Sequence, residues 1–133
     1  MIGGFTGTSL GMTLQQCLEL RDLFEDWSIH ELHVGDCVGA DHQAYSIARH
    51  LGMRVVGHPP TNPIKRTFLK YDTEFSPYPY LERNHNIVDC VKRGSGMLFV
   101  APSSDHETLR SGTWATKRYA EKVGCSICIL SRG

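Results

Sequence analysis

The chain has 133 residues, 41% of them hydrophobic and 21% charged, and its 14 basic residues balance its 14 acidic ones. This length and composition predict a single globular domain, residues 1–133, with a core large enough to fold without disulfides. A net charge of zero lacks the basic stripe of a nucleic-acid-binding protein, so we do not expect nucleic acid as a partner.

The first eleven residues, MIGGFTGTSLG, contain no lysine, no arginine and no long apolar run. They predict neither a signal peptide nor a membrane span. The odd number of cysteines, five, fits a reducing compartment. We therefore expect a cytoplasmic protein without membrane partners.

Short apolar runs alternate along the chain with segments of helical periodicity, which is typical of an α/β fold with a parallel sheet. The predicted strands are residues 1–5, 31–34, 53–56, 97–101 and 125–130. The predicted helices are residues 13–27, 39–51, 81–92 and 113–122. Right-handed crossovers then predict a Rossmann-like, open, doubly wound sheet of about five parallel strands in the order 3-2-1-4-5, flanked by helices.

The first predicted helix has a plausible N-cap in Thr13. Its expected buried stripe is Cys17, Leu20, Phe24 and Trp27, which follow one another at helical spacing.

Residues 57–80 form the longest irregular segment and contain five of the six prolines. Proline excludes a helix interior or a central strand there. The segment carries too many aromatic residues for a free linker, so we predict an ordered flap. Lys65 and Arg66 of this flap either close on a phosphate or form a solvated basic pair.

Cys125 and Cys128 form a C-x-x-C pair inside a predicted strand. Side chains three positions apart on a strand point to opposite faces, so the two thiols are not expected to share a metal. The histidines show no H-x-x-x-H pair. We expect neither a metal site nor a cofactor.

Glycines and polar residues gather where the predicted strands end. In an open parallel sheet these ends meet at one edge, where helix N-termini present free N–H groups to a ligand. Several such loops along one edge predict a site for a phosphorylated ligand, with the aspartates after the second strand accepting from ribose hydroxyls. The candidate binding residues at these strand ends are Thr6, Gly7, Thr8, Gly35, Asp36, Gly39, Asp41, His58, Ser111, Gly112 and Thr113, with Arg66 added from the flap.

Four short motifs occur in a distinctive order along the chain. They are His33-x-Gly35-Asp36-x-x-Gly39-Ala40-Asp41, His58-Pro59-Pro60, Arg83-Asn84-x-x-Ile87-Val88-Asp89 and Ser111-Gly112-Thr113. In these motifs the chain resembles the SLOG superfamily, Rossmann-like proteins that include the LOG-type phosphoribohydrolases and the DNA-processing protein A domain. The resemblance covers nearly the whole chain and is closest to the small stand-alone members. It implies a nucleotide-binding domain and a homodimer or higher homo-oligomer.

One position departs from the LOG pattern. The resemblance places Thr116 where LOG-type enzymes carry the glutamate that acts on the N-glycosidic bond. Threonine cannot serve as a carboxylate acid or base, so hydrolysis by that residue is not expected. Arg83 matches the arginine that points into the family's ligand cleft, so the resemblance adds Arg83 and Asn84 to the candidate binding residues.

Three hypotheses follow. The first is a protein that binds a nucleotide or a nucleotide-derived phosphorylated ligand. The second is a nucleoside 5′-monophosphate N-glycosidase with Asp36 and Arg83 as candidate catalytic residues, in which Asp36 or its neighbour Asp41 has a raised pKa. The third is a protein-interaction module with a vestigial cleft.

Overall fold

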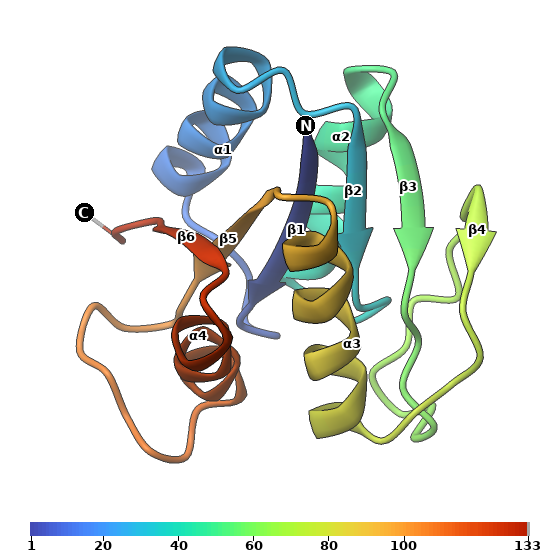
Figure 1. Cartoon of the computed structure of the whole chain (residues 1–133), viewed down its shortest axis with the longest axis vertical. Helices are drawn as coiled ribbons and strands as arrows, with labels where there is room; N and C mark the ends of the chain where they lie inside the picture. The colour runs from blue at the N-terminus through green and yellow to red at the C-terminus, as the bar shows by residue number, and fades with distance from the viewer. Residues whose placement is uncertain (133) are drawn as a thin grey trace.

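The computed structural model describes residues 1–132 and has an α/β Rossmann-like fold. Six parallel strands form one sheet in the order β4-β3-β2-β1-β5-β6, with helices on both of its faces (Figure 1). The strands are β1 (Ile2–Gly7), β2 (Glu31–Val34), β3 (Arg54–Gly57), β4 (Thr73–Glu74), β5 (Met97–Ala101) and β6 (Ser126–Ile129). The helices are α1 (Leu14–Asp26), α2 (Ala40–His50), α3 (Tyr80–Arg93) and α4 (Gly112–Val123).

The predicted order of five strands is confirmed, and the sheet has one strand more than expected. The additional strand, β4, comes from the flap and pairs with β3 at the edge of the sheet (Figure 1). It is two residues long, so it carries no alternating pattern that would reveal it in the sequence. The flap itself is ordered, as predicted.

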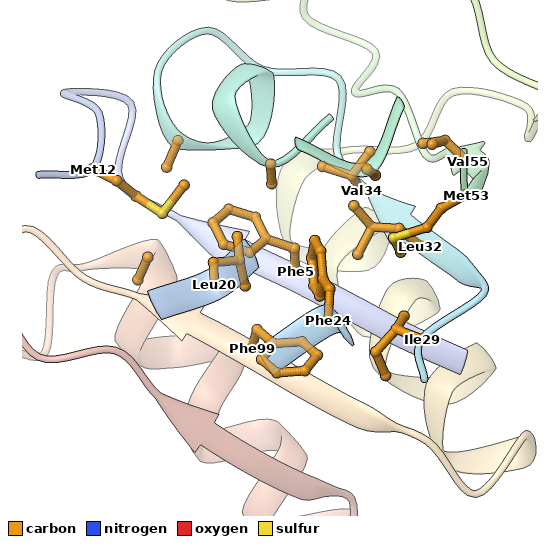
Figure 2. Packing of buried hydrophobic residues seen from close by; sticks show 14 of the residues in the cluster. Phe5, Met12, Leu20, Phe24, Ile29, Leu32, Val34, Met53, Val55 and Phe99 are labelled. Atoms are coloured by element: carbon orange, nitrogen blue, oxygen red, sulfur yellow. The ribbon is translucent and has the colours of Figure 1, made fainter. Parts of the chain in front are cut away.

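One face of the sheet is covered by α1 and α2. Figure 2 shows Phe24 of α1 lying between Phe5 and Phe99, and the rings of Phe24 and Phe99 meet edge to face at 5.3 Å. Leu20 is buried beside them, as predicted.

The limits of α1 follow from its capping. Thr13 is the N-cap, as predicted, and forms a capping box with Gln16. Gln16 is fully buried, and its Nε2 donates to the Leu130 carbonyl at 3.0 Å. Trp27 is the C-cap and is 46% exposed, so its predicted place in the buried stripe is wrong. Cys17 is only partly buried.

The other face of the sheet packs against α3 and α4. Ile87, Val88 and Val91 of α3 are buried there against Leu98 and Val100 of β5. Cys125 belongs to this cluster, whereas Cys128 packs against the cluster on the opposite face. The prediction that this C-x-x-C pair divides between the two faces is confirmed.

None of the helices within residues 1–132 is long and apolar enough to cross a lipid bilayer.

Candidate ligand-binding site

A cavity of about 510 Å³ opens at the carboxyl ends of β1, β2 and β5. Its volume lies in the range of small-molecule sites. Its walls come from the last residues of β1, the β1–α1 loop, the β2–α2 junction, the flap, α3, the β5–α4 loop and the start of α4.

Most of the predicted binding residues line this cavity. They are Thr6, Gly7, Thr8, Gly35, Asp41, Arg83, Asn84, Ser111, Gly112 and Thr113. Four others lie outside the lining, and they are Asp36, Gly39, His58 and Arg66.

The N-terminus of α4 faces the cavity. Ser111 is the N-cap, and its hydroxyl accepts from the Trp114 N–H at 3.3 Å. The N–H groups of Gly112 and Thr113 occupy the first two positions of the helix, where no intrahelical acceptor exists. A Cβ on Gly112 would meet no heavy atom of the described chain within 4 Å, so the backbone here is open. This helix end combines free donors with the positive end of the helix dipole.

Arg83 is held in place by backbone carbonyls at the other side of the cavity. Its side chain is buried, and Nη1 donates to the carbonyl of Gly35 and to that of His58 at 3.2 Å, while Nε donates to Asn84 Oδ1 at 2.7 Å. A Cβ on Gly35 would lie 2.8 Å from the Arg83 guanidinium carbon and 2.8 Å from an Asp41 carboxylate oxygen. Glycine at position 35 is therefore what lets this cation and this acid approach the strand end.

Asp41 is the carboxyl group of the cavity. It lies in the first turn of α2 and is 7% exposed. Burial raises its pKa from 3.8 to about 7, and Asp36 adds to the rise, whereas the charge of Arg83 and backbone hydrogen bonds from Cys37 and Gly35 oppose it. A carboxyl group that titrates near neutrality is able both to give and to take a proton.

Asp36 is turned away from the cavity and anchors the flap. Its carboxylate accepts from Arg66 Nε at 2.7 Å, the Thr67 hydroxyl at 2.6 Å, the Leu69 N–H at 3.3 Å and the Tyr71 hydroxyl at 2.5 Å. Burial by itself would raise the pKa of Asp36, but these hydrogen bonds together hold the pKa below its ordinary value. The same contacts explain why Arg66 does not reach the cavity.

Gly39 and His58 support the site from behind. Gly39 has φ of 84°, and a Cβ there would collide with the Ser9 backbone, so glycine allows the loop after β1 to pack against the start of α2. His58 is buried, with its ring 4.3 Å from that of Phe75 and its Nε2 2.8 Å from His33 Nδ1. Burial lowers the pKa of His58 to about 3, helped by His33 and Arg83.

The flap also contributes to the cavity wall, and one of its residues there is Lys65, for which the sequence left open a phosphate contact or a solvated basic pair. Lys65 lines the cavity, and its Nζ lies 3.4 Å from Ser9 Oγ. The flap is brought there by an antiparallel bridge between Cys37 and Arg66 and by the Val38 N–H, which donates to the Lys65 carbonyl at 2.9 Å. The lining residues that were not predicted are Phe5, Ser9, Cys37, Asn62, Ile64, Tyr80, Ile87 and Ser103.

Thr116 has a structural place within α4. It is buried, and its hydroxyl donates to the Gly112 carbonyl at 2.8 Å, one turn back in the helix. It lies outside the cavity lining.

No protein-family model matches this sequence, and no curated protein matches it significantly. Solved structures do match the fold. One is the X-ray structure of TM1055, a structural genomics target, with a TM-score of 0.64 and 15% sequence identity over 96% of this chain and 72% of that one. Another is the Moco carrier protein from Chlamydomonas reinhardtii, with a TM-score of 0.59 and 18% identity over 97% of this chain and 75% of that one. At these identities the similarity establishes the Rossmann-like fold.

Proposed function

We propose that the cavity binds a nucleotide or a nucleotide-derived phosphorylated ligand. One observation carries the proposal: the open N-terminus of α4 and the cations Lys65 and Arg83 line the same cavity. Backbone N–H groups at a helix start and nearby cations are the usual means by which proteins hold phosphate.

The ligand's phosphate lies against Gly112 and Thr113 in this proposal, with Lys65 closing over it from the flap. Asp41 then faces the sugar, where its carboxyl group exchanges hydrogen bonds with ribose hydroxyls. Tyr80 offers an aromatic ring to the remaining part of the ligand.

A binding role agrees with the character of the site. The resemblance places Thr116 where LOG-type enzymes carry their glutamate, and the Thr116 hydroxyl is engaged inside α4. One of the two fold neighbours is named as a Moco carrier protein, and a carrier binds its ligand without having to convert it.

A second candidate function is hydrolysis of the N-glycosidic bond of a nucleoside 5′-monophosphate. The specific observation in its favour is Asp41, which lines the cavity with a pKa of about 7. In this version Asp41 rather than Asp36 is the catalytic carboxyl group, because Asp36 is engaged by the flap. Asp41 would stabilise an oxocarbenium-like ribose or activate the attacking water.

Mass spectrometry separates the two candidates. The purified protein is denatured and its released small molecules are identified, before and after incubation with ribo- and deoxyribonucleoside monophosphates. We expect an intact, retained nucleotide. Free base with ribose 5-phosphate would instead establish the hydrolase, and the absence of any retained ligand or product, with binding to a partner protein, would favour an interaction module.

A single backbone donor tests where the phosphate lies. Gly112→Pro removes the N–H at the first helical position, where proline is well tolerated, and Ser111 before it already has the extended backbone that proline requires. We expect affinity for the retained nucleotide to fall by about tenfold or more, the effect of losing one hydrogen bond to a charged group. Gly112→Ala is the matched control, because it keeps the N–H and its Cβ has room. Equal affinity of the two variants would contradict the proposed phosphate position.

The homodimer or higher homo-oligomer stays a prediction. Size-exclusion chromatography with light scattering measures it directly.

A further inference from the structure

Three side chains with metal-binding atoms meet between the sheet and α3, apart from the cavity lining. They are His33 on β2, His58 just after β3 and Cys90 on α3. One ligand atom from each lies within 4.8 Å of the others, and His33 and His58 are both buried. The neighbours of His33, Leu32 and Val34, pack on the opposite face, so His33 points toward α3.

A carboxylate orients the first of these imidazoles. His33 Nε2 lies 2.9 Å from Glu31 Oε2, and a carboxylate only accepts, so the proton is on Nε2. The free lone pair of His33 is then on Nδ1, which lies 2.8 Å from His58 Nε2. A carboxylate behind the outer nitrogen of a histidine is the arrangement that fixes metal-binding imidazoles in proteins.

We propose that His33 Nδ1, His58 Nε2 and Cys90 Sγ bind a divalent transition-metal ion of the zinc class, with Glu31 orienting His33. Two imidazole nitrogens and one thiolate are a donor set that zinc accepts, with the fourth position left for water. The local spacing of the histidines argued against a metal, but these ligands come from three separate elements that only the fold brings together.

The distances between the three ligand atoms are close to those found around a bound zinc ion. Two nitrogens that each lie about 2.0–2.1 Å from a tetrahedral zinc are about 3.4 Å apart, and a nitrogen and a sulfur are about 3.6 Å apart. The histidine nitrogens must therefore separate by about half an ångström, and the thiol must approach them from within the existing 4.8 Å. On binding, the His58 proton moves from Nε2 to Nδ1, and the Cys90 thiol gives its proton to solvent, so one proton is released per ion.

Such an ion would tie β2, the start of the flap and α3 together behind the cavity. The His58 carbonyl accepts from Arg83, so the metal would also fix one of the groups that position this cation. The metal site is independent of the proposed nucleotide ligand and is tested without it.

Cobalt(II) is the probe, since thiolate-bound tetrahedral cobalt has visible ligand-field bands and a near-ultraviolet charge-transfer band. The wild-type protein, kept anaerobic, is titrated with cobalt and then with zinc. We expect both sets of bands to appear at one equivalent and zinc to abolish them. Zinc is expected to raise Tm by up to about 10 °C at a hundredfold excess over its Kd. Absence of these bands in the wild-type protein with cobalt in excess overturns the proposal.

Three variants locate the ligands. Cys90→Ser is expected to remove the charge-transfer band, and Cys128→Ser is the matched control, because its thiol packs on the opposite face of the sheet and should leave the titration unchanged. Glu31→Gln is expected to weaken binding by about 10- to 100-fold, as for a residue that orients a ligand.

Circular dichroism verifies that each variant is folded. If Cys90→Ser does not fold, the proposal is tested by the cobalt affinity of Glu31→Gln, because the Glu31 side chain is partly exposed and its replacement is better tolerated. A charge-transfer band that persists in folded Cys90→Ser contradicts the proposal. Equal cobalt affinity of Glu31→Gln and the wild-type protein contradicts it as well.

Discussion

Asp36 and Asp41 lie five residues apart after the same strand, both are almost completely buried, and their pKa values move in opposite directions. Asp36 accepts four hydrogen bonds from the flap, which offset the cost of burying its charge. Asp41 faces the cavity, where Arg83 and two backbone hydrogen bonds do not offset that cost, and its pKa rises to about 7. Burial sets the size of the desolvation penalty, but the number of donors decides whether a carboxyl group stays charged.

The neighbouring flap residues Lys65 and Arg66 differ in the same way. Lys65 lines the cavity, whereas Arg66 pairs with Asp36 at 2.7 Å. Asp36 and Arg66 therefore hold the flap to the β2–α2 junction, whereas Asp41 and Lys65 line the cavity.

The largest expected effect is the loss of the flap anchor. Asp36→Ala removes the 2.7 Å partner of Arg66, whose side chain is only 13% exposed and keeps just the longer contact to Glu74 at 3.9 Å, and it removes the acceptor of three further donors. Breaking a buried charge pair in this way costs about 3–5 kcal/mol in the free energy of unfolding. Urea denaturation measures the loss, and Asp26→Ala, at an exposed position of α1, should change stability by less than about 0.5 kcal/mol. Equal stability of the two variants would show that Asp36 does not hold the flap.

The second effect is a pH dependence that belongs to Asp41. Because its folded pKa is raised from 3.8 to about 7, the neutral form stabilises the fold at low pH, and this contribution is lost as pH rises through 7. Relative to Asp41→Asn, which cannot ionise, the wild-type protein should lose about 3 kcal/mol of unfolding free energy between pH 5 and pH 8. Urea denaturation of both proteins across this range gives the difference. A difference that does not vary with pH would mean that Asp41 titrates at an ordinary value.

Local sequence patterns were sufficient for the main elements of the fold. The apolar runs of β2 and β5 indicated their limits directly, and Thr13 marked the start of a helix where the structure has it. The order of the five longer strands followed from the handedness of crossovers. Cavity residues such as Gly35 and Gly112 were predictable because strand ends of a parallel sheet meet at one edge, whereas Arg83 was indicated by the resemblance in its motif.

What the patterns missed depends on contacts between distant residues. The donors that hold Asp36 are 30 to 35 positions further along the chain, so its role as an anchor has no local signature. Trp27 fits the helical period of α1 but follows its last residue, where the chain turns toward β2 and leaves the ring exposed. The cluster of His33, His58 and Cys90 likewise exists only after β2, β3 and α3 have packed.

The smallest expected effect sharpens the contrast between the two halves of the flap. Lys65→Ala removes a cation from the cavity wall but no buried contact, since the Lys65 side chain is exposed and only its Nζ approaches Ser9 Oγ. We expect stability to stay within about 0.5 kcal/mol of the wild type and affinity for the retained nucleotide to fall by a few fold, about 1 kcal/mol, as for an exposed ion pair. Calorimetric titration at two salt concentrations measures this, because screening should reduce the difference between variant and wild type. Lys70→Ala is the matched control, since Lys70 is an exposed lysine of the same flap that lies outside the cavity lining. If both lysine variants lose affinity equally, the flap attracts the ligand by its overall charge and Lys65 makes no specific contact.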